Sequence, residues 1–276
     1  MYGLSGNFHP RTSLTYVLLL ISSEKIFDCL WSLLCRRRVL LVQVCFHIEP
    51  FEDRNVASIR GNLSYIVDRY GNHSAFYRRP GSSLPVYYIY DSYLVPGDQW
   101  LALLGQNGGP DSVRGTVLDG IFLGLVADRT HLDQLIRCGF DGYYTYFASD
   151  RFTYGSTVSN WASLALRARE SGILFVPSVG PGYDDVRIRP WNAANTRDRR
   201  HGAYFERGFS AAVESQPDMI SITSFNEWHE GTQIEEAVPR QTLDHRYADY
   251  IPQDSDFYLK LSRKWTSVFA EQKHGQ

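Results

Sequence analysis

From residue 39 onward, the sequence alternates between short apolar runs and longer segments with helical periodicity. The apolar runs, rich in β-branched and aromatic residues as strands are, lie at 39–47, 86–90, 117–126, 142–147, 174–179 and 219–225. Helical patterns fall between them at 57–70, 99–104, 131–138, 159–171 and 203–213, and a last one covers 255–271. Such alternation indicates parallel strands with the helices outside. Because a polar loop follows each strand, the pattern favours an α/β fold of the (β/α)8, TIM-barrel type over a doubly wound sheet.

Polar and aromatic residues gather where the predicted strands end. They are His47 and Glu49 after the first run, Tyr90, Asp91 and Tyr93 after the second, Tyr144 and Tyr146 in the fourth, and Arg189 beyond the fifth. Taken singly, each is more often structural, as when a histidine bonds a backbone carbonyl. Active sites of barrels form at the carboxyl ends of the strands. Together, these residues therefore predict a substrate-binding site at one end of the barrel.

The stretch 221–236 begins as a strand and becomes polar and rich in carboxylates after residue 225. In it, Glu227 and Glu230 lie three residues apart. Residues with this spacing point to opposite faces of an extended chain but share a face in a helical turn. If the chain turns at the end of the strand, both carboxylates face one pocket. A solvated acidic loop is the alternative, but the residues beside the pair favour a site: Asn226, Trp228 and His229.

Two carboxyl groups are what glycoside hydrolysis uses: one protonates the leaving oxygen and the other acts at the sugar. One of them needs a raised pKa, which burial or a neighbouring negative charge provides. Crowding Glu227 and Glu230 beside Trp228 would supply both causes.

Metal-dependent hydrolysis is the rival chemistry. The His-Glu-x-x-His zinc pattern is absent, because no histidine follows Glu230 at the required spacing. His47, His229 and Asp91 can still meet in space, although their spacing does not require it. The sequence also lacks a Gly-x-Ser-x-Gly nucleophile elbow. We therefore expect a carboxylate pair that works with no metal and no cofactor.

Composition limits the partners. The chain has 276 residues, enough for one barrel or two smaller domains. Its 28 basic and 30 acidic residues give a near-neutral charge, which argues against nucleic acid, since neutralising phosphates needs a basic surface. No Gly-x-Gly-x-x-Gly fingerprint follows a strand, so nothing supports nucleotide binding. The 18 tyrosines and 6 tryptophans, many beside Asp, Asn or His, suit a carbohydrate site.

The segment Ser224-Phe-Asn-Glu-Trp-His-Glu-Gly-Thr-Gln-Ile-Glu235 resembles the signature of the endo-α-1,2-mannosidases, family 99 of the glycoside hydrolases. The resemblance extends from about residue 44 to the C-terminus. Six further blocks agree with the family in order: His47-Ile-Glu-Pro50, Tyr70-Gly-Asn-His73, Tyr88-Ile-Tyr-Asp-Ser-Tyr-Leu94, Phe140-Asp-Gly-Tyr-Tyr-Thr-Tyr-Phe-Ala-Ser149, Pro177-Ser-Val-Gly-Pro-Gly-Tyr183 and Ile188-Arg-Pro-Trp-Asn192.

The resemblance implies a retaining mechanism in which the substrate's own 2-hydroxyl takes part. By that resemblance, Glu227 removes the 2-hydroxyl proton, and Glu230 protonates the leaving oxygen and then activates water. The implied substrates are glucosylated high-mannose N-glycans on glycoproteins, cut internally at an α-1,2-mannosyl bond to release a glucosyl-mannose oligosaccharide. The implied location is the lumen of the Golgi apparatus, usually with one N-terminal membrane anchor.

The N-terminal part departs from the family's pattern. We divide the chain into an atypical segment, 1–23, and a catalytic barrel domain, 24–276. The apolar run 14–21 is shorter than the roughly 20 residues that a membrane span needs, so an anchor is not evident. The run 14–21 is interpreted as a signal peptide or a buried strand. The pattern over 26–34 predicts a helix. The family's first two strands have no clear counterpart, although 14–21 can stand in for the second.

Two expectations follow from that departure. With six clear strands, the run 39–47 lies at an exposed edge, which predicts poor solubility and little activity for the chain alone. An inactive or glycan-binding isoform of the same family is therefore the main alternative to an active endo-mannosidase, and a metal-dependent barrel hydrolase is the second alternative.

Overall fold

The computed structural model describes residues 16–20, 42–107 and 109–274, and the helix predicted at 26–34 lies outside them. The strands are β1 (Tyr16–Leu20), β2 (Val42–Ile48), β3 (Val86–Ile89), β4 (Ile121–Leu125), β5 (Gly142–Tyr144), β6 (Leu174–Val176), β7 (Ser178–Val179) and β8 (Ser221–Ile222). The α-helices are α2 (Val56–Tyr70), α3 (Gly97–Leu104), α4 (Thr130–Arg137), α5 (Trp161–Glu170), α6 (Ala203–Glu214) and α7 (Phe257–His274). The predicted alternation of strands and helices is confirmed.

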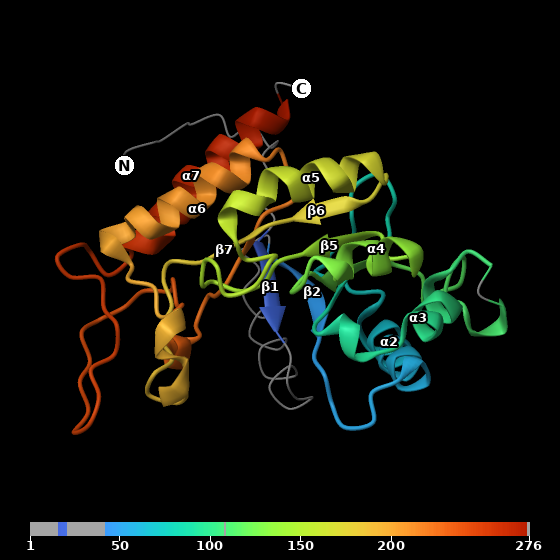
Figure 1. Ribbon diagram of the computed structural model, residues 1–276, viewed down its shortest axis with the longest axis horizontal. Coiled ribbons are helices and arrows are strands. Elements are labelled where there is room, and N and C mark those ends of the chain that lie inside the picture. The colour runs from blue at the N-terminus through green and yellow to red at the C-terminus, as the bar shows by residue number, and fades with distance from the viewer. Residues whose placement is uncertain (1–15, 21–41, 108, 275–276) are drawn as a thin grey trace, which may run out of the picture.

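All the paired strands run parallel, and their order in space is their order in the sequence. One sheet has the order β1-β2-β3-β4-β5-β6, and β7 pairs with β8 in a second, two-stranded sheet. Only Pro177 separates β6 from β7, so the last strand of the first sheet leads directly into the first strand of the second. A doubly wound sheet would reverse its strand order at a switch point, whereas sequential order is the winding of a (β/α) barrel. Figure 1 shows α5 beside β6, and α6 side by side with α7.

The position of β2 in the sheet corrects one expectation. β1 pairs with β2 in parallel, from Tyr16 opposite Val42 to Leu20 opposite Phe46. β2 is therefore not the edge of the sheet, and Val44 and Phe46 are each only 2% exposed. Within the run 14–21, the interpretation as a strand is confirmed for residues 16–20. The edge of the six-stranded sheet is β1 instead, so the expectation of poor solubility no longer rests on β2 and stays a prediction.

Alternate residues of the strands form two separate apolar layers. One layer packs between the sheet and its helices and includes Val44, Phe46, Tyr87, Phe122, Tyr143 and Phe175. The other fills the inner side of the curved sheet and includes Cys45, Val86, Tyr88, Leu123, Tyr144 and Val176. This division follows from the two-residue period of a strand. A barrel interior filled with side chains leaves only its open end for chemistry.

The outer layer depends on amphipathic helices, of which α2 is a clear case. Its buried residues Ile59, Leu63, Ile66 and Tyr70 recur at helical spacing, and the Tyr70 ring stacks on Phe46 with centroids 5.7 Å apart. Asn55 caps the first turn: its side chain accepts from the Ser58 backbone N–H at 3.0 Å, and the Ser58 hydroxyl accepts from the Asn55 N–H at 3.0 Å. This reciprocal pair satisfies two of the unpaired donors at the helix start.

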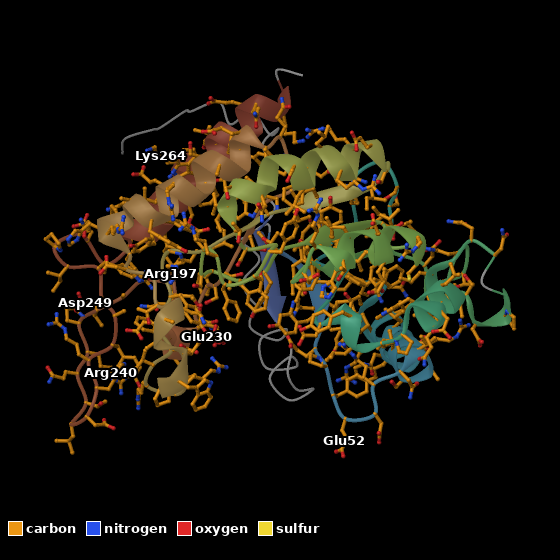
Figure 2. All side chains as sticks on the ribbon, in the orientation of Figure 1. Glu52, Arg197, Glu230, Arg240, Asp249 and Lys264 are labelled. Atoms are coloured by element: carbon orange, nitrogen blue, oxygen red, sulfur yellow. The ribbon has the colours of Figure 1, made fainter. Side chains whose placement is uncertain are left out.

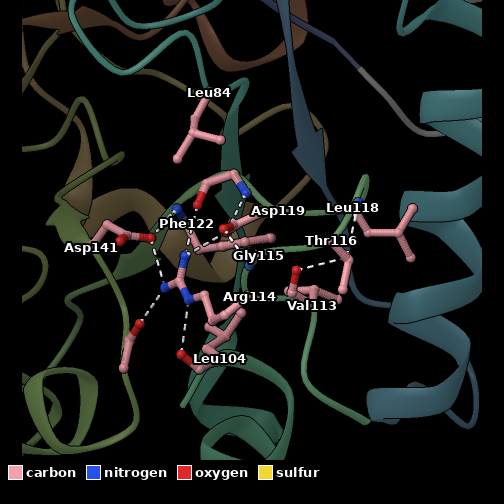
Figure 3. Close-up of polar contacts among 12 residues, drawn as sticks. Leu84, Leu104, Val113, Arg114, Gly115, Thr116, Leu118, Asp119, Phe122 and Asp141 are labelled. Carbon is pink, nitrogen blue, oxygen red and sulfur yellow. Dashed lines mark hydrogen bonds and ion pairs between the residues drawn. The ribbon is translucent and has the colours of Figure 1, made fainter. Parts of the chain in front are cut away.

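A buried arginine joins the amino ends of β4 and β5, opposite the end where a barrel site forms. Figure 3 shows the Arg114 side chain among its polar partners. The side chain of Arg114 is 6% exposed and contacts five acceptors. These are the carbonyls of Leu104, Gly120 and Gly139, at 2.9, 2.8 and 2.6 Å, and the carboxylates of Asp119 and Asp141, at 3.1 and 2.9 Å. Asp141 also accepts the backbone N–H of Phe122 at 2.8 Å. Arg114 therefore sets the spacing of two neighbouring strands.

Among the described residues, no helix is both long and apolar enough to cross a lipid bilayer.

We expect Arg114→Met to lower the free energy of unfolding by about 3 kcal/mol, because removing one partner of a buried ion pair leaves the other charge uncompensated. Urea denaturation followed by circular dichroism measures it. Arg167→Met is the matched control, since Arg167 pairs with Asp133 at 2.9 Å but both side chains are largely exposed, and such pairs contribute less than about 1 kcal/mol. Equal losses from the two variants would contradict the assigned role of Arg114.

Candidate active site

The chain turns immediately beyond β8, as the spacing of the carboxylates predicts. Glu227 directly precedes a short 3-10 helix, η6 (Trp228–Glu230), and the Glu230 N–H donates to the Glu227 carbonyl at 3.3 Å. Residues three apart lie one above the other in a 3-10 helix. The expected helical turn is therefore confirmed. Glu230 lies at the end of the molecule toward which the β1 arrow points (Figures 1 and 2).

Hydrogen bonds on both sides fix this turn. The Ser224 hydroxyl accepts from the Glu227 N–H at 2.9 Å and lies 2.7 Å from the Thr232 hydroxyl. Beyond η6, the N–H groups of Ile234 and Glu235 both donate to the Phe225 carbonyl at 3.0 Å. The polar loop therefore closes on itself, and its carboxylates have a fixed backbone.

Tyr146, just beyond β5, connects this loop to the neighbouring strands. Its backbone N–H donates to the Ser178 hydroxyl at 2.7 Å, and its carbonyl accepts from the Thr223 hydroxyl at 2.5 Å. The Tyr146 ring stacks on His47 at 5.3 Å and meets the edge of Tyr90 at 4.8 Å. Burial raises the pKa of Tyr146, and the negative charges of Glu230, Glu49 and Glu227 raise it further. The structure thus brings together residues predicted from four different strands.

His47 and Tyr144 lie behind the surface of this site. His47 places Nδ1 2.5 Å from Glu49 Oε1 and Nε2 2.8 Å from the Tyr144 hydroxyl. His47 is only 2% exposed and Tyr144 1%, whereas the Glu49 side chain is about a third exposed. The geometry indicates that His47 and Tyr144 orient Glu49, and that Glu49, Tyr90 and Tyr146 present the accessible groups.

A second polar group stands at the end of β3. The Tyr93 hydroxyl donates to Asp91 Oδ1 at 2.8 Å, and burial raises the pKa of Asp91. Arg54, in the loop after β2, donates to the backbone carbonyls of Tyr90 and Asp91 at 2.6 and 2.5 Å. The sequence did not identify Arg54, because its partners are backbone atoms on another strand. Its positive charge offsets that of the carboxylates nearby.

Glu227 and Glu230 lie in different environments. Glu227 is exposed, whereas the Glu230 side chain is 20% exposed and accepts from Arg189 Nη1 at 2.9 Å. Burial raises the pKa of Glu230; the hydrogen bond and positive charge of Arg189 oppose that rise, and the negative charge of Glu227 adds to it. One carboxyl group thus favours its protonated form while its neighbour faces water, which is the difference that separates an acid from a base.

The three residues expected beside the pair take different places. Trp228 is half-buried, and its Nε1–H donates to Glu235 Oε1 at 2.6 Å. His229 is exposed and lies 6.4 Å from the Tyr247 ring, centroid to centroid. Asn226 is also exposed. The structure therefore ties Trp228 to the return of its own loop and leaves the other two at the surface.

Two residues that the sequence did not identify as part of the site, Asp185 and Asn192, lie behind Glu230 with Tyr183, which follows the fifth predicted strand. Asp185 is 0% exposed and accepts from the Tyr183 hydroxyl at 2.9 Å and from Arg189 Nη1 at 3.1 Å. The available signal was spacing: Asp185 and Arg189 are four residues apart and form an ion pair.

Within residues 16–20, 42–107 and 109–274, no group of three or more His, Cys, Asp or Glu side chains is arranged to hold a metal ion. The predicted histidines have other neighbours: His47 bonds Glu49 and Tyr144, and His229 faces Tyr247.

A pair of carboxyl groups at the carboxyl ends of parallel barrel strands defines the class as a barrel of the glycoside hydrolase type. The sequence profile of Glycosyl hydrolase family 99 matches residues 28–271, and the chain belongs to this family.

Named relatives agree with the family. The chain is 49% identical over 235 residues to a glycoprotein endo-alpha-1,2-mannosidase of Rattus norvegicus, with 84% of this chain and 51% of that protein covered. It is 46% identical over 255 residues to the protein of the same name from Xenopus laevis, covering 91% and 57%. The chain thus spans about half the length of the curated relatives it matches. A solved structure of a family 99 endo-alpha-mannosidase from Bacteroides thetaiotaomicron is 48% identical, has a TM-score of 0.81, and is matched over 84% of this chain and 67% of that one.

The raised pKa of Glu230 predicts a change in stability with pH. The folded protein holds the Glu230 proton more tightly than the unfolded chain, whose glutamates titrate near pH ~4.3. Stability is therefore lost as pH rises from that value through the raised pKa. Gln cannot ionise, so we expect Glu230→Gln to have a higher Tm than the unaltered chain at pH 7.

Differential scanning calorimetry from pH 4 to pH 7 measures that difference, which should vanish at the acid end. Glu170→Gln, at an exposed site, is the control and should change Tm little at any pH. A Glu230→Gln variant that melts below the unaltered chain at pH 7 would contradict the pKa assignment.

Proposed function

We propose that this chain is an endo-acting α-1,2-mannosidase that cleaves by a retaining, carboxylate-pair mechanism. The observation that carries the proposal is the fixed turn beyond β8, where Glu227 is exposed and Glu230 is partly buried against Arg189. The identity of 46–49% to proteins named glycoprotein endo-alpha-1,2-mannosidase supports the choice of reaction.

In the first step, Glu227 takes the proton of the sugar's 2-hydroxyl, and the 2-oxygen attacks C1. The glycosidic bond breaks as Glu230 gives its proton to the leaving oxygen, so a 1,2-anhydro sugar forms. In the second step, water attacks C1 and loses a proton to Glu230, while the ring opens and the 2-oxygen recovers its proton from Glu227. The raised pKa of Glu230 favours the protonated form that the first step needs, and two inversions at C1 give net retention.

The proposed substrates are glucosylated high-mannose N-glycans on glycoproteins, cut internally to release a glucosyl-mannose oligosaccharide. Tyr90 and Tyr146 supply rings of the kind that stack on the apolar faces of sugars. Glu49 and Asp91 supply acceptors for hydroxyl groups, and Tyr93, Asn226, Trp228 and His229 are further candidate contacts around the same rim. Nothing in the charge balance suits nucleic acid.

We place this reaction in the Golgi lumen, where such glycans are processed. Immunofluorescence of the full-length gene product tests the location, and a cytosolic distribution would contradict it.

We expect Glu230→Gln and Glu227→Gln each to lower kcat by roughly 10²–10⁴-fold, the range for loss of a general acid or base, while glycan binding persists. Turnover of a glucosylated high-mannose glycan and calorimetric binding measure the two effects. Glu236→Gln is the matched control, because Glu236 belongs to the same sequence block but is exposed and is bonded to Ser255 rather than to the pair. Near-normal turnover from Glu230→Gln or Glu227→Gln would remove that residue from the mechanism, and binding without turnover by the unaltered chain would favour the glycan-binding isoform.

Activity should not depend on a metal. A mechanism that uses only carboxyl groups has no metal to lose, so extensive dialysis against a chelator should leave kcat unchanged. The same assay is repeated after adding back divalent cations. Activity that is lost on dialysis and restored only by a cation would favour the metal-dependent hydrolase instead.

A further inference from the structure

Behind Glu230 lies a second carboxylate that the proposed mechanism does not use. Asp185 is completely buried, and three side chains donate to it. The Tyr183 hydroxyl donates at 2.9 Å, Asn192 Nδ2 at 3.0 and 3.1 Å, and Arg189 Nη1 at 3.1 Å. A buried carboxylate held by this many donors is fixed in position.

Arg189 lies between the two carboxylates. The same Nη1 that donates to Asp185 also donates to Glu230 Oε1 at 2.9 Å. The Arg189 side chain is 42% exposed, so few neighbours would hold a side chain of this length on their own. The bond to the buried Asp185 is what fixes the guanidinium beside Glu230.

The backbone couples the two groups as well. The Asp184 N–H donates to the Glu230 carbonyl at 2.8 Å, and the Arg189 N–H donates to the Asp185 carbonyl at 2.7 Å. Gly231, next to Glu230, has φ of +60°, and a Cβ there would lie 3.2 Å from the Asp184 nitrogen. The loop after β7 and the turn after β8 therefore pack too closely to move independently.

We propose that Asp185 is a positioning residue: it holds Arg189 against Glu230 and takes part of that positive charge, so that Glu230 remains able to give up a proton and recover it. This inference rests on the proposed function of Glu230 as the acid and base, and adds the device that tunes it. Without Arg189, burial alone would trap the proton on Glu230. If Asp185 did not share the positive charge of Arg189, that charge would lower the pKa of Glu230, and Glu230 would be ionised before the leaving oxygen needs its proton.

The charges that face Glu230 are few enough to assign signs. Arg189 stabilises its ionised form, whereas Glu227 and Asp185 destabilise it. Tyr146 and Tyr183 also face it, but burial raises the pKa of both phenols, so they stay neutral near pH 7. Among the described residues, the pKa of Glu230 therefore depends mainly on one cation, Arg189, which is shared between carboxylates.

We expect Arg189→Met and Asp185→Asn to shift the pKa of Glu230 in opposite directions. Arg189→Met removes the stabilising cation, so the pKa of Glu230 rises and the basic limb of kcat/KM moves up by about 1 pH unit. Asp185→Asn keeps an oxygen that accepts from Arg189, so the guanidinium stays beside Glu230, but it removes the competing negative charge. The pKa of Glu230 therefore falls, and the limb moves down by a similar amount. Asp184→Asn is the matched control: it removes the same charge one residue away, where the side chain is exposed and bonds only the Val186 N–H. Its limb should not move.

A carboxyl ¹³C NMR titration measures the pKa of Glu230 in the free protein, with the signal assigned by comparison with Glu230→Gln. This pKa should be highest in Arg189→Met, lower in the unaltered chain and lowest in Asp185→Asn. Because the titration needs no turnover, it tests the inference separately from the proposed function: an inactive chain can still show the shifts, and an active one can lack them. Arg189 is partly exposed, so Arg189→Met provides the test where Asp185→Asn does not fold. An unmoved titration in Arg189→Met, or an Asp185→Asn titration that is unchanged or moves upward, would overturn the proposal.

Discussion

Parallel pairing between strands that are neighbours in the sequence is the constraint on which the rest of the molecule depends. Because every paired strand runs in the same direction, their carboxyl ends meet at one rim, and residues distant in the sequence converge there. The ladder of hydrogen bonds through Ser178, Tyr146 and Thr223 continues this pairing beyond the regular strands. Glu227 and Glu230 lie at the site only because β8 delivers them to the same rim as β2, β3 and β5.

The rim is rich in carboxylates, and two arginines compensate for them. Arg54 is held near Glu49 and Asp91 by hydrogen bonds to the backbone carbonyls of Tyr90 and Asp91. Arg189 donates directly to Glu230. The tyrosines between these groups are buried enough to remain neutral. Charge at the site is thus set by a few fixed groups, and those shielded from solvent affect one another more strongly than they would in water.

Sequence periodicity was sufficient for most of the architecture, because strands and helices bury residues with different repeats. It left open the short apolar run 14–21, which fits a signal peptide as well as a strand; the strand at 16–20 is evident only from its pairing with β2. The i, i+3 spacing of Glu227 and Glu230 correctly predicted their shared turn. The burial of individual side chains was not predictable: His47 and Tyr144 lie on the expected face but are buried beneath the surface. Asp185 was missed because its four-residue spacing from Arg189 lies in a loop, where such spacing does not indicate an ion pair as it does on a helix.

Endo-acting cleavage with retention at this rim is the central claim, and the stereochemistry and size of the first product test it most directly. Proton NMR of a glucosylated high-mannose glycan during digestion observes both. The carboxylate-pair mechanism with 2-hydroxyl participation predicts a single glucosyl-mannose oligosaccharide whose new reducing end appears first as the α-anomer. Release of free glucose or mannose, or initial appearance of the β-anomer, would contradict it.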